Sequence, residues 1–289
     1  MASDHFLSLA RSTRAVWRRM LEDMEARGGK GRLADLRSRH IRQDLARLPP
    51  HPANNRLKVW RAFGRWCVEV GLIDVDPARD VRRHKTPESD GHTAWTREDV
   101  AAFRARWPHD TAQRPAFELM YRTCASIGDA CHLGPGMVKD GWITYKRQKS
   151  GSEATSPVTA SAPAWFEADD NLARCLALAP RHMTYMVTAA GAPRSRKAAA
   201  QWFSRACTEA GLPHLSAHGI RKHRASVFKE NGATAEQRMA VLGHETESEA
   251  ARYSKSADLK RIIRGTEVPT APEPSSKSDD FSIEIKGTR

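Results

Sequence analysis

The sequence predicts a mainly helical protein of two domains, the second of which combines helices with a short antiparallel sheet. Three observations predict this. Apolar residues recur at helical spacing between Phe6 and Val70. Residues 141–147 are rich in β-branched and aromatic side chains, and 154–159 can return as a paired strand after a Ser-Gly turn. Residues 84–92 (HKTPESDGH) are polar and contain Pro and Gly, which indicates a linker between the two regions.

Three helices are expected in the first domain. The first begins near Phe6 and stops at Gly28-Gly29, and the second covers Leu33 to Leu48, where Pro49-Pro50 closes it. Asn54-Asn55 is predicted to cap the third helix. The apolar stripe of that third helix contains Leu57, Trp60, Phe63, Cys67 and Val70.

The second domain is expected to begin with a helix whose start combines Thr96 and Asp99 in a capping box. A further helix over 115–122 and the two strands follow, and residues 183–188 are a candidate third strand. Four helices are then predicted over 195–210, 218–231, 234–243 and 247–263. The tail, 267–289, has three prolines and four serines and is expected to be mobile, with the apolar segment 281–285 as a candidate docking element.

The composition excludes several classes of protein. Hydrophobic residues make up 40% of the 289 residues and charged residues 28%, which is the balance of a globular chain. There is no apolar run of about 18 residues and no signal-peptide pattern, so membrane and secreted proteins are poor interpretations. The five cysteines form no CxxC pair, which favours buried free thiols in a reducing cytoplasm.

The basic charge is spread over both domains. The formal net charge is +13, with 19 basic and 12 acidic residues in 1–90 and 25 and 17 in 91–266. This distribution suits a protein whose two domains both bind a polyanion, although many basic proteins bind nothing specific. On the third helix, the basic residues outside the apolar stripe form either a solvated face or a phosphate-binding surface; they are Arg56, Lys58, Arg61 and Arg65.

The most informative motif lies near the C-terminus. His218 and Arg221 form an H-x-x-R pair, which by itself occurs by chance in a chain of this composition. A Gly-His pair follows, with His244 placed 23 residues after Arg221, and Tyr253 comes 9 residues later. Only four tyrosines occur in the chain, so the combined spacing carries far more information than the pair.

With these residues the chain resembles the tyrosine recombinase (phage integrase) family over about residues 5–265. NRLKVWRAFGRWCVEVGLIDVDPA resembles the family's helical core-binding domain, TREDVAAF the opening of its catalytic domain, and WITYKRQKSG the hairpin with its catalytic lysine. The resemblance implies a core-binding domain over 1–86, a linker over 87–93, a tyrosine-recombinase catalytic domain over 94–266 and a C-terminal tail over 267–289.

The resemblance also implies a site. Tyr253 would attack a DNA phosphodiester and form a 3′-phosphotyrosine, and Arg221 would clamp the phosphate through its planar guanidinium. His218 and His244 would bind the phosphate or manage protons, and Lys149 would protonate the leaving 5′ oxygen. Alternatively, Tyr253 is a core residue and Lys149 an ordinary turn lysine. The DNA-binding residues expected are Lys222 and the four basic residues of the third helix.

No metal or other cofactor is implied, because side chains supply the positive charge. The histidines His214, His218 and His223 lie close together in the sequence but have no neighbouring acidic or cysteine ligand, so they do not predict a metal site. The implied partners are double-stranded DNA and three further copies of the chain in a tetramer, with DNA-bending proteins as candidate accessory partners. The implied location is the bacterial cytoplasm, at the nucleoid when bound.

One position departs from the family pattern. The family places an arginine three residues before an acidic residue in this region, and here Ser126 precedes Asp129. Three explanations are open: Arg122 swings in, the protein binds DNA without cutting it, or Ser126 is an introduced substitution.

Three functions are therefore compared. The first is a site-specific DNA recombinase, and the second is a catalytically weak or inactive relative that acts as a DNA-binding or regulatory factor. The third is a nicking and resealing enzyme of the type IB topoisomerase kind, which would relax plasmids without sequence preference.

Overall fold

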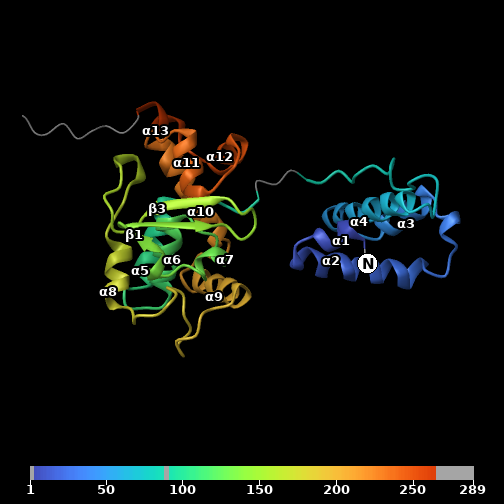
Figure 1. The fold of residues 1–289 in the computed structure, drawn as a ribbon. Coiled ribbons are helices and arrows are strands. Elements are labelled where there is room, and N and C mark those ends of the chain that lie inside the picture. Colours follow the sequence, from blue (N-terminus) through green and yellow to red (C-terminus); the bar gives the residue numbers. More distant parts are fainter. Residues whose placement is uncertain (1–2, 88–90, 265–289) are drawn as a thin grey trace, which may run out of the picture. The chain divides into compact units, whose positions relative to one another are not determined.

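The computed structural model describes residues 3–87 and 91–264, and it divides into two compact units, Met1–Ser89 and Asp90–Arg289 (Figure 1). The expected tail over 267–289 and the middle of the expected linker lie outside the described residues. Within the described residues, no helix combines the length and the apolar character that crossing a membrane requires. The mainly helical fold class with a short antiparallel sheet in the second unit is confirmed.

The first unit contains helices and no strand within its described residues. Its α-helices are α1 (Asp4–Ser8), α2 (Arg11–Gly28), α3 (Ser38–Ala46) and α4 (Pro50–Glu69), with a short 3-10 turn η1 (Leu33–Asp35). Ile41, Leu45 and Leu57 form the centre of a small core between α3 and α4. The second predicted helix was therefore too long, because residues 33–37 form the 3-10 turn and two extended residues.

The predicted cap of α4 was wrong. The helix begins at Pro50, whose fixed φ suits the first helical position and whose missing N–H would have no partner there. Asn54 lies inside the helix, where its side-chain amide donates to the carbonyl of His84 (2.9 Å) and accepts from the His84 amide (2.8 Å). This asparagine therefore holds the chain that leaves the unit rather than starting a helix.

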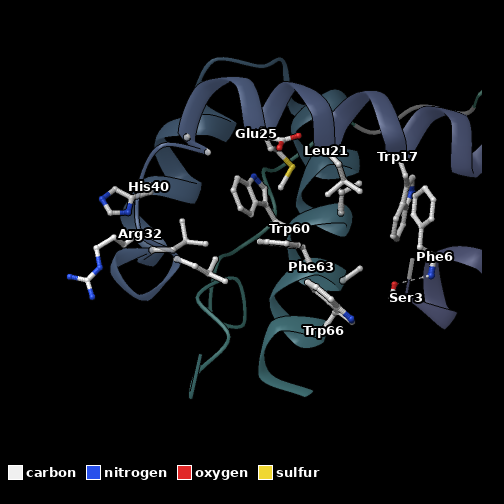
Figure 2. A pocket seen from close by; sticks show the side chains of 18 of the residues that line it. Ser3, Phe6, Trp17, Leu21, Glu25, Arg32, His40, Trp60, Phe63 and Trp66 are labelled. Atoms are coloured by element: carbon white, nitrogen blue, oxygen red, sulfur yellow. Dashed lines mark hydrogen bonds between the residues drawn. The ribbon is translucent and has the colours of Figure 1, made fainter. Parts of the chain in front are cut away.

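The first unit also contains an apolar cavity of about 700 Å³ (Figure 2). Aromatic side chains from α2 and α4 line it, with the 3-10 turn and its flanking residues at one end. The rings include Trp17, Trp60, Phe63 and Trp66. The small core of this unit thus leaves a large apolar surface between α2 and α4 uncovered.

The second unit combines helices with a three-stranded antiparallel sheet. Its strands are β1 (Val138–Lys139), β2 (Trp142–Lys146) and β3 (Glu153–Pro157), in the order β1-β2-β3. The helices before and after the sheet are α5 (Arg97–Arg106), α6 (Gln113–Thr123), α7 (Ile127–Ala130), α8 (Asn171–Leu178) and α9 (Arg196–Glu209). The last four are α10 (Ala217–Glu230), α11 (Ala235–Leu242), α12 (Glu247–Tyr253) and α13 (Leu259–Arg264), and the 3-10 turns are η2 (Pro135–Met137) and η3 (Ala164–Phe166).

An aromatic core holds α5, α6 and α9 together. Phe103 stacks on Phe117 (ring centroids 4.7 Å apart) and on Phe203 (5.5 Å). Trp95 packs beside them and donates its indole N–H to the carbonyl of Ser216, one residue before α10 (2.9 Å). The core thereby positions the start of α10, the helix that carries His218 and Arg221.

Two further predictions needed correction. Residues 183–188 do not form a strand and contribute only the isolated bridge Val187–Pro193, because the third strand is the short β1. The helix expected over 247–263 is two helices that separate after Tyr253. Ser254 is buried at this break and accepts a hydrogen bond from Arg238 on α11 (2.7 Å). The predicted capping box of Thr96 and Asp99 is present.

Candidate active site

Four residues that are far apart in the sequence meet in the second unit. His218 and Arg221 lie one turn apart on α10, His244 follows the C-terminus of α11, and Tyr253 is the last residue of α12. The Tyr253 hydroxyl lies 3.1 Å from Nε2 of His218. The Tyr253 ring lies 4.4 Å from the His244 ring and 5.6 Å from the Arg221 guanidinium carbon. We call these four residues the tyrosine cluster.

Backbone carbonyl groups hold Arg221 in place. Its side chain is 0% exposed and donates to the carbonyl of Leu242 (2.8 Å) and to that of Cys124. Cys124 has a positive φ of 52°, and this left-handed residue ends α6 and turns its carbonyl out of the helix. Nε of Arg221 is buried and has no hydrogen-bond partner within the described parts of the chain. The guanidinium thus keeps donor capacity for an acceptor that the protein does not supply.

His244 is positioned by the residue before it. Gly243 ends α11 with a φ of 60°, a conformation that favours glycine. The His244 side chain is 7% exposed, and neither ring nitrogen has a hydrogen-bond partner among the described residues. A buried polar group without a partner is costly, so both ring nitrogens have hydrogen-bonding capacity for a polar ligand.

Burial and positive charge keep both histidines of the tyrosine cluster neutral. Burial lowers the pKa of His218 to about 4, with the nearby His92 as the next cause. Burial also lowers the pKa of His244 to about 3, followed by the charges of Arg221 and Arg147. Both imidazoles are therefore neutral near pH 7 and able to accept a proton.

These pKa shifts predict an acid-sensitive fold. An unfolded histidine titrates near pH 6.5, so below that pH the unfolded chain binds protons that the folded chain does not. The free energy of unfolding should be insensitive to these groups above pH 7 and should fall as the pH drops from about 6.5 to about 5. Urea unfolding across this range, above the titration of most carboxyl groups, measures the effect. The variant His244→Gln should show a shallower loss; equal stability at pH 7 and pH 5 in the unmodified protein would contradict the prediction.

The hairpin between β2 and β3 approaches the cluster from another side. Arg147 donates to the carbonyl of Gly243 (2.7 Å), and Ser152 donates to the same oxygen (2.8 Å). The amide of Gln148 donates to Asp129 on α7 (2.9 Å). Lys149 lies at the exposed turn of this hairpin. Arg147 was not predicted from the sequence, since no motif distinguishes it from the other basic residues of the hairpin.

Ser126 does not turn toward the cluster. Its hydroxyl donates to the carboxylate of Asp129 (2.7 Å) and accepts from the Asp129 amide (3.2 Å), so it caps the short helix α7. Arg122 also has partners outside the cluster. It donates to the carbonyl of Pro157 (2.8 Å) and lies over the ring of Phe166 (5.5 Å). The structure therefore does not support the explanation that Arg122 takes the place of the missing arginine.

The other two histidines of the sequence cluster are separated from His218. His214 is exposed. His223 is buried, and its Nδ1 lies 2.7 Å from the carbonyl oxygen of Trp95. His223 therefore ties α10 to the start of the unit and is a structural residue.

The basic residues of α4 do not form one surface. Arg56 is 5% exposed and forms ion pairs with Asp44 and with Asp23 (2.6 Å), so it links α4 to α3 and α2 and is not presented to a ligand. Arg61 is half-buried and donates to the carbonyl of Val81 (2.8 Å). Lys58 and Arg65 are exposed, which leaves them as the candidate phosphate contacts of this helix. Lys222, the other expected contact, is half-buried next to Arg221.

Arg56 is expected to be a stability residue. Arg56→Ala should lower the free energy of unfolding by about 3 kcal/mol, because it leaves the half-buried Asp44 without its charged partner. The change Lys58→Ala on the same helix should cost less than about 0.5 kcal/mol, since Lys58 is exposed. Urea unfolding of the full chain compares the two. An equal effect of both variants would show that the Arg56 ion pairs contribute nothing.

One family model matches this chain, and solved structures share its fold. The model of the phage integrase family matches residues 98–260. A crystal structure of a lambda integrase (75–356) dimer bound to a COC′ core site is similar, with a TM-score of 0.73 and 16% identity over 96% of this chain and 94% of that one. A Tn1549 transposon integrase (82–397) in complex with circular intermediate DNA has a TM-score of 0.67 and 12% identity, over 89% and 93%. A search of curated proteins found no significant match.

Proposed function

Because the chain belongs to the phage integrase family of tyrosine recombinases, we propose that it cleaves and rejoins duplex DNA at specific sites through a covalent 3′-phosphotyrosine at Tyr253. The observation that carries the proposal is the tyrosine cluster. A phenol, a neutral imidazole within 3.1 Å of it and a buried guanidinium with free donor capacity are the groups that this transfer needs.

The proposed first step uses Tyr253, His218 and Lys149. The Tyr253 oxygen attacks the phosphorus, and the bond between phosphorus and the 5′ oxygen of the next nucleotide breaks. Nε2 of neutral His218 accepts the phenolic proton, and the ammonium of Lys149 gives a proton to the leaving 5′ oxygen. A bound phosphodiester would raise the pKa of both imidazoles toward the ordinary range, because its negative charge favours their protonated forms. Attack by the freed 5′ hydroxyl of another strand reverses the step, so the bond energy is conserved.

Cleavage is proposed to occur within one protomer. Tyr253 packs against the apolar cluster that includes Phe228 and Leu242, so its own chain already holds the nucleophile beside His218 and His244. The first unit is proposed to act as the core-binding domain, with Lys58 and Arg65 on phosphates. Each phosphate contact should add to the salt dependence of binding.

The similar structures support DNA as the partner and a tetramer as the assembly. They include a lambda integrase dimer on a core site and a lambda integrase tetramer bound to a Holliday junction. We infer the same partner and the same assembly for this chain, in the cytoplasm at the nucleoid, with DNA-bending proteins as accessory partners.

A second function is favoured by one observation. Ser126 is neutral and committed to Asp129, so the position that carries an arginine in the family contributes no charge. Loss of a transition-state arginine costs about 10³–10⁵ in the rate of other phosphoryl transfers. A protein that binds the recombination site without cutting it, as a regulatory factor, is therefore the alternative.

A covalent-adduct assay separates the two functions. DNA that flanks the gene is screened by mobility shift, and the bound segment is then nicked near its centre. The short fragment that carries the freed 5′ hydroxyl then diffuses away, and the adduct accumulates. A protein–DNA band on a denaturing gel, with the DNA mapped to Tyr253 by mass spectrometry, is the expected result. Binding without any adduct supports the regulatory alternative, and relaxation of any plasmid would indicate a topoisomerase.

A further inference from the structure

The phosphate site proposed above lacks one of the two arginines of the family pattern. The second positive charge on the phosphate therefore comes from another residue or is absent. The Ser126 hydroxyl is held by Asp129, and Arg122 is held by the carbonyl of Pro157. Among the remaining basic residues that the structure describes, Arg147 and Arg238 both lower the pKa of His244 through their charge. Arg238 is held by the hydroxyl of Ser254 (2.7 Å) and the carbonyl of Thr234, whereas Arg147 donates to the carbonyl of Gly243.

The Arg147 side chain lies directly over Gly243, the residue before His244. Its Cδ stands 2.6 Å from the place that a Cβ on residue 243 would occupy, so only glycine leaves room for it. One terminal nitrogen donates to the Gly243 carbonyl, which fixes the guanidinium at the loop. Its Nε is buried and has no hydrogen-bond partner among the described residues, as is also true of Nε of Arg221 and of both nitrogens of His244. The unsatisfied groups of the site therefore include Arg147.

The charge of Arg147 acts on the two histidines of the tyrosine cluster. It contributes to the lowered pKa of both His218 and His244. The pKa of Arg147 is itself lowered by burial first and by the charge of Arg221 next, although an arginine stays protonated. Neither guanidinium forms an ion pair with a carboxylate within the described parts of the chain, and the Asp129 carboxylate opposes the lowering of the Arg147 pKa only in part. Two like charges held together in this way are unfavourable for the protein alone and favourable around an anion.

We propose that Arg147 supplies the second guanidinium on the scissile phosphate, in place of the arginine that is absent at position 126. Arg221 and Arg147 would then each donate to a non-bridging oxygen, from α10 and from the β2–β3 hairpin. Arg147 forms no covalent bond and transfers no proton. This inference rests on the proposed function, and it explains how the chain cleaves DNA although position 126 is a serine.

The test compares two nicked substrates that differ at one non-bridging substituent of the scissile phosphorus. One carries the ordinary scissile phosphate, and the other a methylphosphonate, in which a methyl group replaces one charged non-bridging oxygen. Arg147→Gln should slow adduct formation about 10³-fold on the phosphate, by analogy with other transition-state arginines. On the methylphosphonate, which has no charge to neutralise, its rate should come within about tenfold of the unmodified protein. Lys146→Ala, an exposed neighbour on β2, is the matched control and should cleave normally.

A second comparison separates phosphate binding from support of the loop. Ser126→Arg in the Arg147→Gln background should restore part of the lost rate, because it returns a guanidinium to the phosphate but not to the Gly243 carbonyl. Arg147→Lys should fold as the unmodified protein does and cleave slowly, since an ammonium cannot form the planar contact. A defect of equal size on both substrates, with no rescue by Ser126→Arg, would overturn the inference and leave Arg147 a positioning residue.

The inference and the proposed function fail in different ways. If the unmodified protein forms an adduct and Arg147→Gln forms it equally fast, the inference alone is wrong. If the unmodified protein binds the site and forms no adduct, the proposed function is wrong, and the anion site is tested directly. Sulfate, at an ionic strength matched with chloride, should then raise the melting temperature of the unmodified protein more than that of Arg147→Gln. An equal rise would reject Arg147 as an anion ligand.

Discussion

Replacement of Tyr253 by phenylalanine is expected to abolish the covalent protein–DNA adduct while DNA binding persists. The substitution removes the oxygen that is proposed to bond to phosphorus, so adduct formation should fall by about 10⁴-fold or more. The ring remains against its apolar neighbours and beside His244, and the chain loses one hydrogen bond to His218 worth about 1 kcal/mol. Denaturing gels on the nicked substrate measure the adduct, and mobility shifts measure binding.

The control for this result is a tyrosine outside the cluster. Tyr185 lies in the loop after α8, and Tyr185→Phe should form the adduct at the normal rate. Adduct formation by Tyr253→Phe at the normal rate would mean that another side chain is the nucleophile, and the tyrosine cluster would then be a structural feature.

Replacement of Arg221 by lysine is expected to have the next largest effect. Lysine keeps the positive charge but loses the planar fork that can hold the Leu242 carbonyl and a phosphate oxygen together. We expect the rate of adduct formation to fall by about 10²–10³, the cost of a lost transition-state donor. The Kd for DNA should change by less than tenfold, because many phosphate contacts share the binding energy.

Arg224 provides a matched control for this substitution. It is one turn further along α10, is buried like Arg221, donates to the carbonyl of Phe166 and lies over the ring of Phe228 (4.5 Å). Arg224→Lys should lower the melting temperature without slowing cleavage by the folded protein. If Arg221→Lys and Arg224→Lys slow cleavage equally, the effect of Arg221 is a loss of packing and not of phosphate binding.

Local signals in the sequence were sufficient for most of the elements. The capping box at Thr96 and the β-branched run before Ser150 predicted α5 and β2 because these signals act within a few residues. Predictions failed where distant contacts decide. Asn54 is a good capping residue, yet both the nitrogen and the oxygen of its side-chain amide form hydrogen bonds with the backbone of His84, thirty residues away. The strand expected over 183–188 has no partner strand, since β1 occupies the edge of the sheet.

The spacing of the motif predicted which residues meet. His218, Arg221, His244 and Tyr253 come together because short helices with defined ends place them at the junction of α10, α11 and α12. The roles of basic residues could not be predicted in the same way. Arg56 and Lys58 are two residues apart, and one is paired in the interior while the other is exposed.

The sequence by itself determined the fold class, the members of the tyrosine cluster and the absence of an arginine at position 126, because each depends on residue identity and spacing along the chain. The tertiary structure decided which guanidinium groups face the tyrosine cluster and which form their contacts away from it. Arg122, Arg147 and Arg224 are chemically identical. What separates them is the partner that each finds after folding: the Pro157 carbonyl for Arg122, the Gly243 carbonyl beside the cluster for Arg147, and the Phe166 carbonyl for Arg224. Burial determines what each contact is worth.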